Sequence, residues 1–387
     1  MAGSQNQSRI HERVSNVAKR KTKEKDDSYF YASQWKLMYQ KFRKHKLAMA
    51  STIVLIIFYV TAIFGNFIAP QGTEQFAGEY VNCGPTPIHF FHDGKWEGPF
   101  VYGLKRVRDP ETYMNVFTED KDVVCHIRFF VQGDKGGEYK FLGLIPTNLH
   151  LFQAEGDGQV FLFGTDSMGR DLFSRVVLGG QISLFIPVVG MLLTVFLGLL
   201  MGSLSGYFGG WVDVVIQRLI EVIRSFPNVP LWMALSAALP ATLKPAQVFM
   251  LMTLILSLIS WPDLARTVRS QFFAIKQEDF VMAAKISGAP MGAVVVRHMI
   301  PSFLSYIIVN MTLTIPQLIV GETTLSFLGL GLRSPATSWG VLLQETNKLE
   351  TIMFYSWKLI PMIFVFLAVL CFNFLGDGLR DAADPYK

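Results

Sequence analysis

The sequence predicts an all-α polytopic membrane protein with six transmembrane helices and a small β-rich insert between the first two. Three observations predict this class. Of the 387 residues, 51% are apolar and only 17% are charged, and the mean hydropathy is +0.33, which is too apolar for a soluble chain of this size. The apolar residues form long blocks, each near the ~20 residues that cross a bilayer. A single long polar stretch separates the first block from the rest.

The apolar blocks define the candidate spans, which are 47–69, 182–207, 214–239, 246–261, 303–330 and 357–375. The fourth is the weakest because it is short and ends at Trp261-Pro262, so the pattern allows a tilted or broken helix there. In the second block Gly198, Gly202 and Gly206 recur every fourth residue. This small-residue stripe predicts a close helix–helix contact, with a partner that the sequence does not identify.

Basic residues predict the orientation of the chain. Residues 1–46 carry twelve Lys and Arg side chains directly before the first span, so this tail is expected in the cytoplasm. Six spans then place the C-terminus on the same side, together with a basic loop over 266–300. The first block is too long for a signal-peptide core and lacks a small-x-small cleavage pattern, which predicts an uncleaved anchor. Topology explains the basic tail, and no nucleic-acid partner is expected.

The polar stretch 70–162 is expected outside the cytoplasm. Segments 100–104, 123–131 and 139–144 are rich in β-branched and aromatic residues and are predicted strands, with a hairpin turn at 133–137 joining the last two. The insert either shapes the outer vestibule, contacts a substrate-binding protein, or is a passive insertion. Cys83 and Cys125 both fall within it, so a disulfide between them is permitted but not required.

Polar residues inside the spans are candidates for the translocation pathway. Arg218, Glu221 and Arg224 are three residues apart in the third block, so they can neutralise one another on one helical face. The fifth block contains Asn310, Gln317 and Glu322, and Glu322 has no obvious partner nearby in the sequence. These residues either line a pathway or hydrogen-bond to a partner subunit. Prolines in the third and fifth blocks supply bend points for a moving gate; they are Pro227, Pro230 and Pro316.

Catalytic and cofactor signatures are missing from the sequence. No G-x-x-x-x-G-K-[ST] phosphate loop occurs, and Leu178-Gly179-Gly180-Gln181 only superficially resembles an ATPase signature. No metal or nucleophile constellation takes its place, because the histidines are scattered and no Cys-His cluster has ligand spacing. We therefore expect no catalytic residue, no metal site and no bound cofactor, and a chain that is not itself an enzyme.

Two stretches carry a family resemblance. The segment from Glu278 to Pro301 resembles the cytoplasmic "EAA" loop of permease subunits of ATP-binding-cassette (ABC) importers. The segment FGTDSMGRDLFSRVVLGGQISL, residues 163–184, resembles the start of the C-type permease core of dipeptide, oligopeptide and nickel importers. Further matches extend the resemblance from 163 to the C-terminus; they are at 206–213, 326–331, 338–340 and 374–381.

The resemblance implies a permease core over 163–387 of the type I ABC importer kind, in a bacterial inner membrane with both termini in the cytoplasm. It implies a heterodimer with a homologous permease, two ABC ATPase subunits that hold ATP and magnesium, and an extracytoplasmic substrate-binding protein. Membrane lipid is a further expected partner of this chain. The expected substrate is a short peptide, with nickel and small glycosides as alternatives.

The loop residues expected to couple the chain to the ATPases are Glu278, Asp279, Ala283, Ala284, Gly288 and Pro301. The glutamate that gives the loop its name falls at Met282 here, so acidic charge is shifted to Glu278 and Asp279. The charge pairing of that glutamate is therefore not carried over. In the 163–184 segment, Asp166 is expected to cap a turn, while Arg170, Asp171 and Arg175 keep an amphipathic helix at the membrane surface without contacting ligand.

A different class remains open at this point. An ion-coupled secondary transporter or channel could also have six spans, with Glu322 as a proton site. Such a protein would need no ATPase and no docking turn around Gly288. The sequence also shows no internal repeat of the kind that builds many such carriers.

Overall fold

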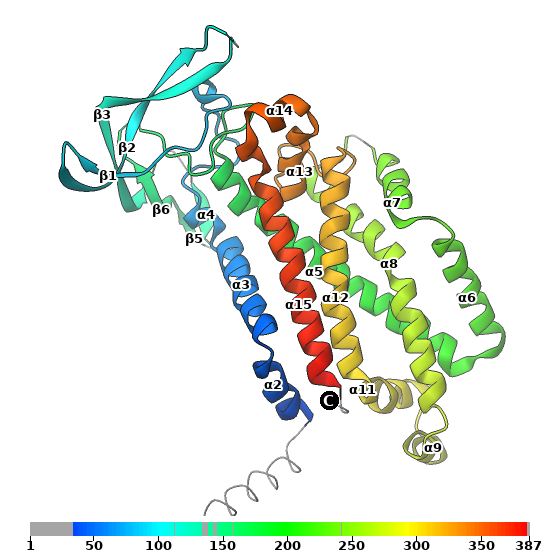
Figure 1. The fold of residues 1–387 in the computed structure, drawn as a ribbon. Helices are drawn as coiled ribbons and strands as arrows, with labels where there is room; N and C mark the ends of the chain where they lie inside the picture. The colour runs from blue at the N-terminus through cyan, green and yellow to red at the C-terminus, as the bar shows by residue number, and fades with distance from the viewer. Residues whose placement is uncertain are drawn as a thin grey trace, which may run out of the picture.

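The computed structural model describes residues 34–384, except 112, 134–137, 142–144, 157 and 241. The long helices lie side by side in an elongated bundle, with a lobe of strands at one end (Figure 1). The first 33 residues of the predicted basic tail, most of the predicted turn at 133–137 and the end of the predicted strand 139–144 lie outside the described residues.

Helices make up most of the described chain. The α-helices are α2 (Gln34–Lys44), α3 (Lys46–Ile63), α4 (Gly65–Ile68), α5 (Leu172–Phe208), α6 (Gly210–Arg224), α7 (Asn228–Ala237), α8 (Pro245–Ile275), α9 (Asp279–Ile286), α10 (Met291–Ala293), α11 (Ile300–Ser302), α12 (Leu304–Phe327), α13 (Trp339–Leu343), α14 (Leu349–Phe354) and α15 (Ile360–Ala383). Shorter turns are the 3-10 helices η1 (Gly78–Tyr80), η3 (Gln344–Asn347) and η4 (Ser356–Leu359), and the π-helix η2 (Val294–Met299).

Five helical segments among the described residues are long and apolar enough to cross a membrane. They are Lys46–Ile63, Leu172–Phe208, Pro245–Ile275, Leu304–Phe327 and Ser356–Ala383. These correspond to the first, second, fourth, fifth and sixth predicted blocks. The chain is therefore a multi-pass helical membrane protein by length and composition.

The third predicted span is not one helix. It consists of α6, with 15 residues, and α7, with 10, separated at Ser225-Phe226-Pro227. Pro227 precedes α7 in an extended conformation (ψ 137°), and the residue before a proline is disfavoured in a helix. The predicted block 214–239 is therefore two helices and not one continuous span, and the break coincides with the bend point predicted at Pro227.

The fourth predicted span is part of one continuous helix. The sequence allows a break at Trp261-Pro262, but α8 continues through Pro262 to Ile275. The helix on either side of the proline is held by burial of Trp261, Ala265 and Phe272. Packing against neighbouring helices thus outweighs the lost backbone hydrogen bond, and the first part of the predicted 266–300 loop is a continuation of α8.

The glycine stripe of α5 contacts α8 of the same chain. A Cβ atom at Gly198 would lie 2.9 Å from Leu264, at Gly202 2.7 Å from the Ala265 carbonyl oxygen, and at Gly206 2.4 Å from Phe272 Cβ. These distances are far inside van der Waals contact, so the two backbones approach closely only because the three residues lack side chains. The predicted helix–helix contact is confirmed, and its partner lies within the chain.

Replacing Gly202 with valine is expected to force α5 and α8 apart and to lower the free energy of unfolding by about 1–3 kcal/mol. Leu200→Val, at an exposed position on the same helix, is the matched control and should change stability little. Thermal unfolding of the two purified variants measures the difference. Equal stability of both would contradict the close α5–α8 contact.

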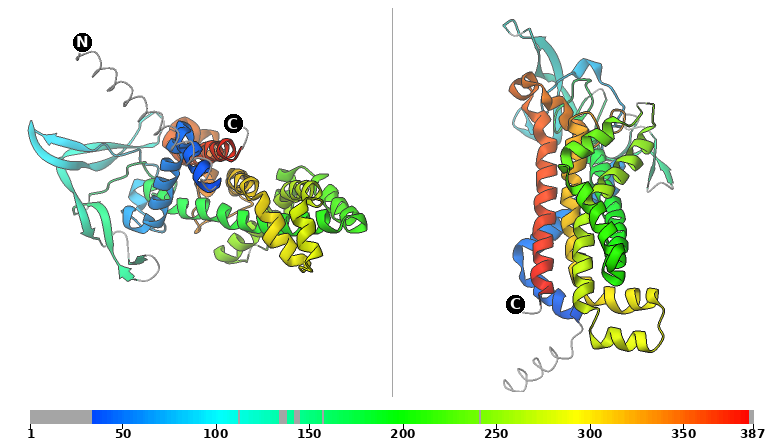
Figure 2. Two further views of the ribbon diagram at one scale, coloured as in Figure 1. Left: turned by 90° about the horizontal axis from the view of Figure 1, so that it is seen from below. Right: turned by 90° about the vertical axis from the view of Figure 1, so that its right-hand side faces the viewer.

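The remaining long helices complete the bundle around α5. α12 packs against α15, α5 and α8, and α3 packs against α15 and α5. Figure 2, seen from below, shows α5 running along the bundle, with α3 and α15 near one end of it and α6 and α8 near the other. The main core is formed where these helices meet, around Leu256, Leu318 and Trp339.

Strands occur only in the segment after α4, within the described residues. They are β1 (His89–His92), β2 (Lys95–Arg108), β3 (Asn115–Gln132), β4 (Tyr139–Phe141), β5 (Ile145–Thr147) and β6 (Leu149–Ala154). The first sheet has the order β1-β2-β3-β6, with antiparallel neighbours, and β4 pairs with β5 as a separate antiparallel hairpin.

The pairing of these strands differs from the prediction. The predicted segments 100–104 and 123–131 lie in β2 and β3, and the described part of 139–144 lies in β4. However, β3 pairs with β2 and β6 and not with β4, so the predicted hairpin between β3 and β4 is wrong. Cys83 and Cys125 are both buried and form no disulfide, and burial raises the pKa of the Cys83 thiol to about 12.

Hydrogen bonds to the backbone hold this segment against the helices. His150 Nδ1 lies 2.7 Å from the carbonyl oxygen of Ala69, and Gln153 Nε2 donates to the carbonyl oxygen of Pro70 at 2.8 Å. Both acceptors follow directly after α4. The base of the insert is therefore fixed to the end of the first span.

Candidate functional site

A short helical hairpin projects from one end of the bundle. It contains α9, α10, η2 and α11, between α8 and α12. Figure 1 shows α9 at the end that also carries α2 and the C-terminus, opposite the strands. The right-hand view of Figure 2 shows this hairpin extending sideways at that end of the long helices. Its position makes it accessible to another protein.

The inner side of α9 is anchored to its own chain. Val281 is fully buried and packs in the main core with Val294 and Met299 of the returning segment. Ala284 is half-buried and packs against the same core. Ala284, predicted to dock a partner, therefore contacts this chain's own residues, whereas its neighbour Ala283 is exposed.

The outer side of α9 exposes large apolar side chains. Phe280 and Met282 are each 44% exposed, and Ile286 is 83% exposed. Exposed apolar side chains gathered on one short helix mark an interaction surface. The sequence-based prediction named the small residues of this helix and missed these three. The sequence could have indicated them, because large apolar residues follow the acidic residues at the start of the helix.

Gly288 ends α9 by adopting a left-handed conformation, with φ +75°. The Ala289 amide then donates to the Ala284 carbonyl oxygen at 3.1 Å, as in a glycine-terminated helix. A Cβ at Gly288 would have no heavy atom within 4 Å, so it faces open space. Glu278, Asp279 and Pro301 are also exposed.

Polar contacts fix the hairpin to the end of α5, and the neighbouring part of α8 to α6. Lys276 Nζ donates to the Tyr207 carbonyl oxygen at 2.8 Å, and Lys285 Nζ lies 5.4 Å from the centroid of the Tyr207 ring. Just before the hairpin, Arg269 of α8 makes two hydrogen bonds to Asp213 of α6, at 2.5 and 2.6 Å. A bidentate pair of this kind fixes orientation as well as distance. These contacts join the hairpin to α5, and α8 to α6.

Two of the polar residues predicted on the fifth span lie on the open side of α12. Asn310 is half-buried and lines an open cleft of about 570 Å³, together with Tyr306, Leu313 and Arg380. Gln317, seven residues further, is exposed. Positions seven residues apart lie on the same face of a helix, so Asn310 and Gln317 share a face that this chain does not cover.

Glu322 has a different environment. It is fully buried, and its Oε1 accepts hydrogen bonds from Ser326 and Ser338, each at 2.8 Å. Ser326, one turn later in the same helix, is the sequence-near partner that the sequence-based prediction lacks. Ser338 also accepts from the Val341 amide at the start of α13. Glu322 thus connects α12 to α13 through bonds within this chain.

The charges of α6 do not form the predicted triad. Arg218 pairs with Glu221, with Nη1 and Oε2 2.6 Å apart, as expected for residues three apart. Arg224, however, pairs with Asp263 of α8. The sequence-based prediction missed this pair because α6 and α8 are neighbours in the fold but are far apart in the sequence. Among the described residues, no group of His, Cys, Asp or Glu could hold a metal ion.

Comparison with known proteins identifies the family. A model of the binding-protein-dependent transport system inner membrane component matches residues 194–386, and one of the N-terminal TM domain of oligopeptide transport permease C matches 33–85. The oligopeptide transport system permease protein OppC of Escherichia coli K12 is 43% identical over 225 residues, which cover 58% of this chain and 72% of that protein. The chain belongs to the C-type permeases of the dipeptide and oligopeptide ABC importer family.

Two further relatives extend the similarity. OppC of Haemophilus influenzae is 41% identical over 224 residues, 58% of this chain and 70% of that protein. The dipeptide transport system permease protein DppC of Bacillus subtilis is 38% identical over 349 residues, 90% of this chain and 84% of that protein. The similarity of this permease to DppC therefore extends well beyond the segments that the two family models match.

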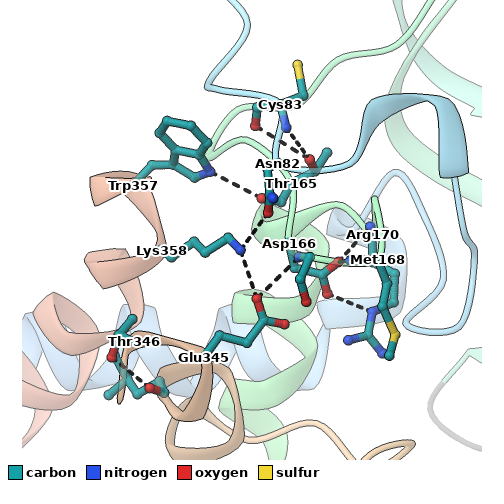
Figure 3. A network of polar contacts seen from close by, with 12 residues as sticks. Asn82, Cys83, Thr165, Asp166, Met168, Arg170, Glu345, Thr346, Trp357 and Lys358 are labelled. Atoms are coloured by element: carbon teal, nitrogen blue, oxygen red, sulfur yellow. Dashed lines mark hydrogen bonds and ion pairs between the residues drawn. The ribbon is translucent and has the colours of Figure 1, made fainter. Parts of the chain in front are cut away.

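A buried polar network lies at the end of the permease opposite α9. Figure 3 shows Lys358 and Glu345 directed toward Asn82 and the turn containing Asp166. Lys358 Nζ, in a side chain only 4% exposed, lies 2.7 Å from Asn82 Oδ1 and 2.9 Å from Glu345 Oε2. The Ser167 amide donates to the same glutamate oxygen at 3.2 Å. The network joins the insert, the start of α5 and the C-terminal helices of the permease.

Asp166 is the second centre of this network. Its Oδ1 accepts from the amides of Met168 at 2.8 Å and Arg170 at 3.0 Å, so it caps the turn as predicted. Its Oδ2 pairs with the guanidinium groups of both Arg170 and Arg175. All three charged side chains are buried. The prediction that Arg170, Asp171 and Arg175 lie on an amphipathic surface is wrong, because all three side chains are buried in the fold.

Asp171 caps the first turn of α5. Its Oδ2 accepts from the Ser174 amide at 2.8 Å and from the Ser174 hydroxyl at 2.5 Å. Burial nevertheless raises the pKa of this carboxyl to about 6, despite the opposing effect of these hydrogen bonds. Its folded-state pKa is thus above the unfolded value, and the stability that it contributes is present at low pH and lost as pH rises through about 6.

Replacing Asp171 with asparagine is expected to remove this loss, because asparagine keeps a cap oxygen but carries no charge. Between pH 4 and pH 7 the permease should lose more stability than the Asp171→Asn variant. Thermal unfolding over that range, with both proteins in the same detergent, measures the difference. Parallel pH profiles would show that Asp171 does not titrate in this range.

Proposed function

We propose that this permease is the membrane subunit of an ATP-driven, binding-protein-dependent importer of short peptides. It would form the translocation pathway with a homologous permease and receive work from two ABC ATPase subunits. The observation that supports this most is the projecting hairpin, whose helix α9 exposes Phe280, Met282 and Ile286 beyond the bundle. Apolar side chains at such a position need a partner surface.

The mechanism that fits the contacts is alternating access. Closure of the ATPases on ATP would push α9, and the anchoring of Val281 in the core together with the Arg269–Asp213 pair would carry that push to α8, α6 and α5. Pro227 and Pro316 supply bend points in the moving helices. We assign Glu278, Asp279, Ala283 and Gly288 to the ATPase contact, with Pro301 at its exit and Ala284 as an internal anchor.

The pathway would run along the uncovered face of α12 that carries Asn310 and Gln317. Glu322 is assigned to the interior of the subunit, because its carboxylate already bonds Ser326 and Ser338. Peptides are the proposed substrate class, since the relatives are named as oligopeptide and dipeptide permeases. Nickel and small glycosides are alternative substrates to be tested in the same uptake assay. This chain would bind no cofactor, with ATP and magnesium held by the ATPase subunits.

The proposed topology has six crossings of a bacterial inner membrane, five by continuous helices and one by the broken pair α6 and α7. Both termini and α9 would lie in the cytoplasm, and the strand-containing insert 70–162 outside. The insert would then lie where a substrate-binding protein delivers its ligand. Only five continuous helices among the described residues are long and apolar enough to cross a membrane. The broken pair α6 and α7 would therefore make the sixth crossing.

This topology predicts a labelling pattern. An impermeant thiol reagent should modify Lys121→Cys, at an exposed position of β3, in intact cells. It should modify Ser287→Cys, at the exposed end of α9, only after the cells are permeabilised. The wild-type chain, whose three cysteines are buried, provides the background. The reverse pattern would overturn the topology.

The function is tested by purification and reconstitution. The importer predicts that two ATPase chains and a second permease co-purify with this protein, and that vesicles containing this assembly accumulate peptide only with ATP and the binding protein. The alternative is an ion-coupled carrier. Uphill uptake by vesicles that contain this chain alone, under an ion gradient, would establish the carrier and exclude the proposal.

A further inference from the structure

An apolar groove lies beside the end of the first span. It has a volume of about 300 Å³ and is lined by Phe64, Phe67, Tyr139, Phe141, Ile145 and neighbouring strand residues. One wall is the end of α3 with α4, and the other is the β4–β5 hairpin. The Phe64 and Phe141 ring centroids are 5.8 Å apart, so the two walls are in contact at the base. Figure 1 shows α4 and β5 close together where α3 ends.

The groove continues an exposed apolar stripe of α3. Ile53, Ile57 and Val60 are 54%, 52% and 45% exposed, and Phe64 and Phe67 follow them at helical spacing. These five residues therefore share one side of the first span and its extension. A membrane-spanning helix exposes such a stripe to lipid unless protein covers it. The groove therefore faces lipid wherever the stripe does.

Its depth matches the membrane surface. α3 has 18 residues, about 27 Å at 1.5 Å per residue, which is close to the ~30 Å hydrocarbon core. The groove begins at the last turn of this helix. Tyrosine is enriched at that depth, where Tyr139 lies, and no charged residue is among those that line the groove. The hydroxyl groups of Tyr139 and Thr147, which are in the lining, both hydrogen-bond to the Leu149 backbone. The rest of the lining is apolar, which fits an acyl chain better than a polar ligand.

We infer that this groove holds an acyl chain of a phospholipid from the leaflet at the insert's end of the bundle. The β4–β5 hairpin then lies in the membrane surface beside α3, with Ile145, which is 63% exposed, in contact with lipid. The lipid would fill the space between the hairpin and the first span. This inference does not depend on the coupling role of α9 or on the substrate.

Spin labels in the reconstituted complex test the inference. Nitroxide labels are attached at Ile145→Cys and, from the opposite wall, at Phe67→Cys, in vesicles of phosphatidylethanolamine and phosphatidylglycerol. At both sites collisions with oxygen, which partitions into lipid, should exceed collisions with a water-soluble nickel chelate severalfold. Val60→Cys on the stripe is the lipid-exposed reference. Val116→Cys, at an exposed position of β3, is the aqueous control and should show the reverse ratio.

Each other result contradicts the inference. A groove label that prefers the nickel chelate would show that the hairpin stands in water. Groove labels shielded from both reagents, with Val60 still accessible to oxygen, would show that a protein segment occupies the groove. Shielding of Val60 as well would show that a partner subunit covers the whole stripe. A thermal unfolding profile like that of the wild-type permease confirms that each labelled variant is folded.

Discussion

Gly288→Trp is expected to abolish ATP-driven uptake while the protein is still produced and inserted. Two effects act together at this position. Gly288 has φ +75°, a conformation that costs a residue with a side chain about 1–2 kcal/mol. The new indole would also project from the end of α9, where a Cβ meets no atom of this chain. It therefore leaves the bundle intact and obstructs the proposed ATPase contact.

Gly292→Trp is the matched control. Gly292 lies in the same hairpin and an added Cβ would also meet open space there, but its φ is not positive. This variant should retain most uptake. The measurement is peptide uptake by vesicles that contain the complete complex, together with binding of peptide to the binding protein and recovery of the ATPases. Normal uptake by Gly288→Trp would count against docking at α9, and equal loss in both variants would show that the whole hairpin is intolerant of bulk.

Asp166→Asn is expected to destabilise the fold more than any other single change that we propose. The substitution removes the charge that neutralises the buried guanidinium groups of Arg170 and Arg175. Leaving buried charge without its partner costs about 3–5 kcal/mol. The loss falls at the junction of the insert with α5, so the variant should be recovered in low yield and unfold at a lower temperature.

Glu155→Gln is the comparison for this change. Glu155 pairs with Arg128 on the surface of the insert, where their side chains are 33% and 70% exposed. An exposed ion pair contributes about 1 kcal/mol or less. Thermal unfolding of both variants and the wild-type permease in one detergent measures the difference. A melting temperature of Asp166→Asn equal to that of Glu155→Gln would show that the buried network contributes little stability.

Hydropathy and motifs predicted much of this protein from the sequence. Five of the six predicted blocks coincide with long apolar helices, and the resemblance to the importer permeases is confirmed by the family model over 194–386 and by the relatives. The glycine stripe of α5 predicted a close helix contact, because glycines four apart lie along one helical side. Each of these signals is local or depends on a repeat within one helix.

The failures involve contacts between distant parts of the chain. Pro227 breaks a helix whereas Pro262 does not, and the difference is the burial of Trp261 and its neighbours against other helices. The candidate coupling surface shows the same limit. Ala283 and Ala284 are adjacent and identical in type, yet only the tertiary structure distinguishes the exposed side chain from the one packed in the core.

The sequence by itself determined that this chain spans a membrane, that it belongs to the importer permeases, and that the segment around α9 resembles their coupling loop. It could do so because apolar length and short motifs are properties of contiguous residues. Only the tertiary structure decided that Asp166 neutralises two buried arginines, that Glu322 is bonded within its own chain, and that an aromatic groove lies beside the first span. The reason is that burial and pairing depend on which helices and strands meet, and these contacts join residues as far apart as Asn82 and Lys358, 276 positions along the chain.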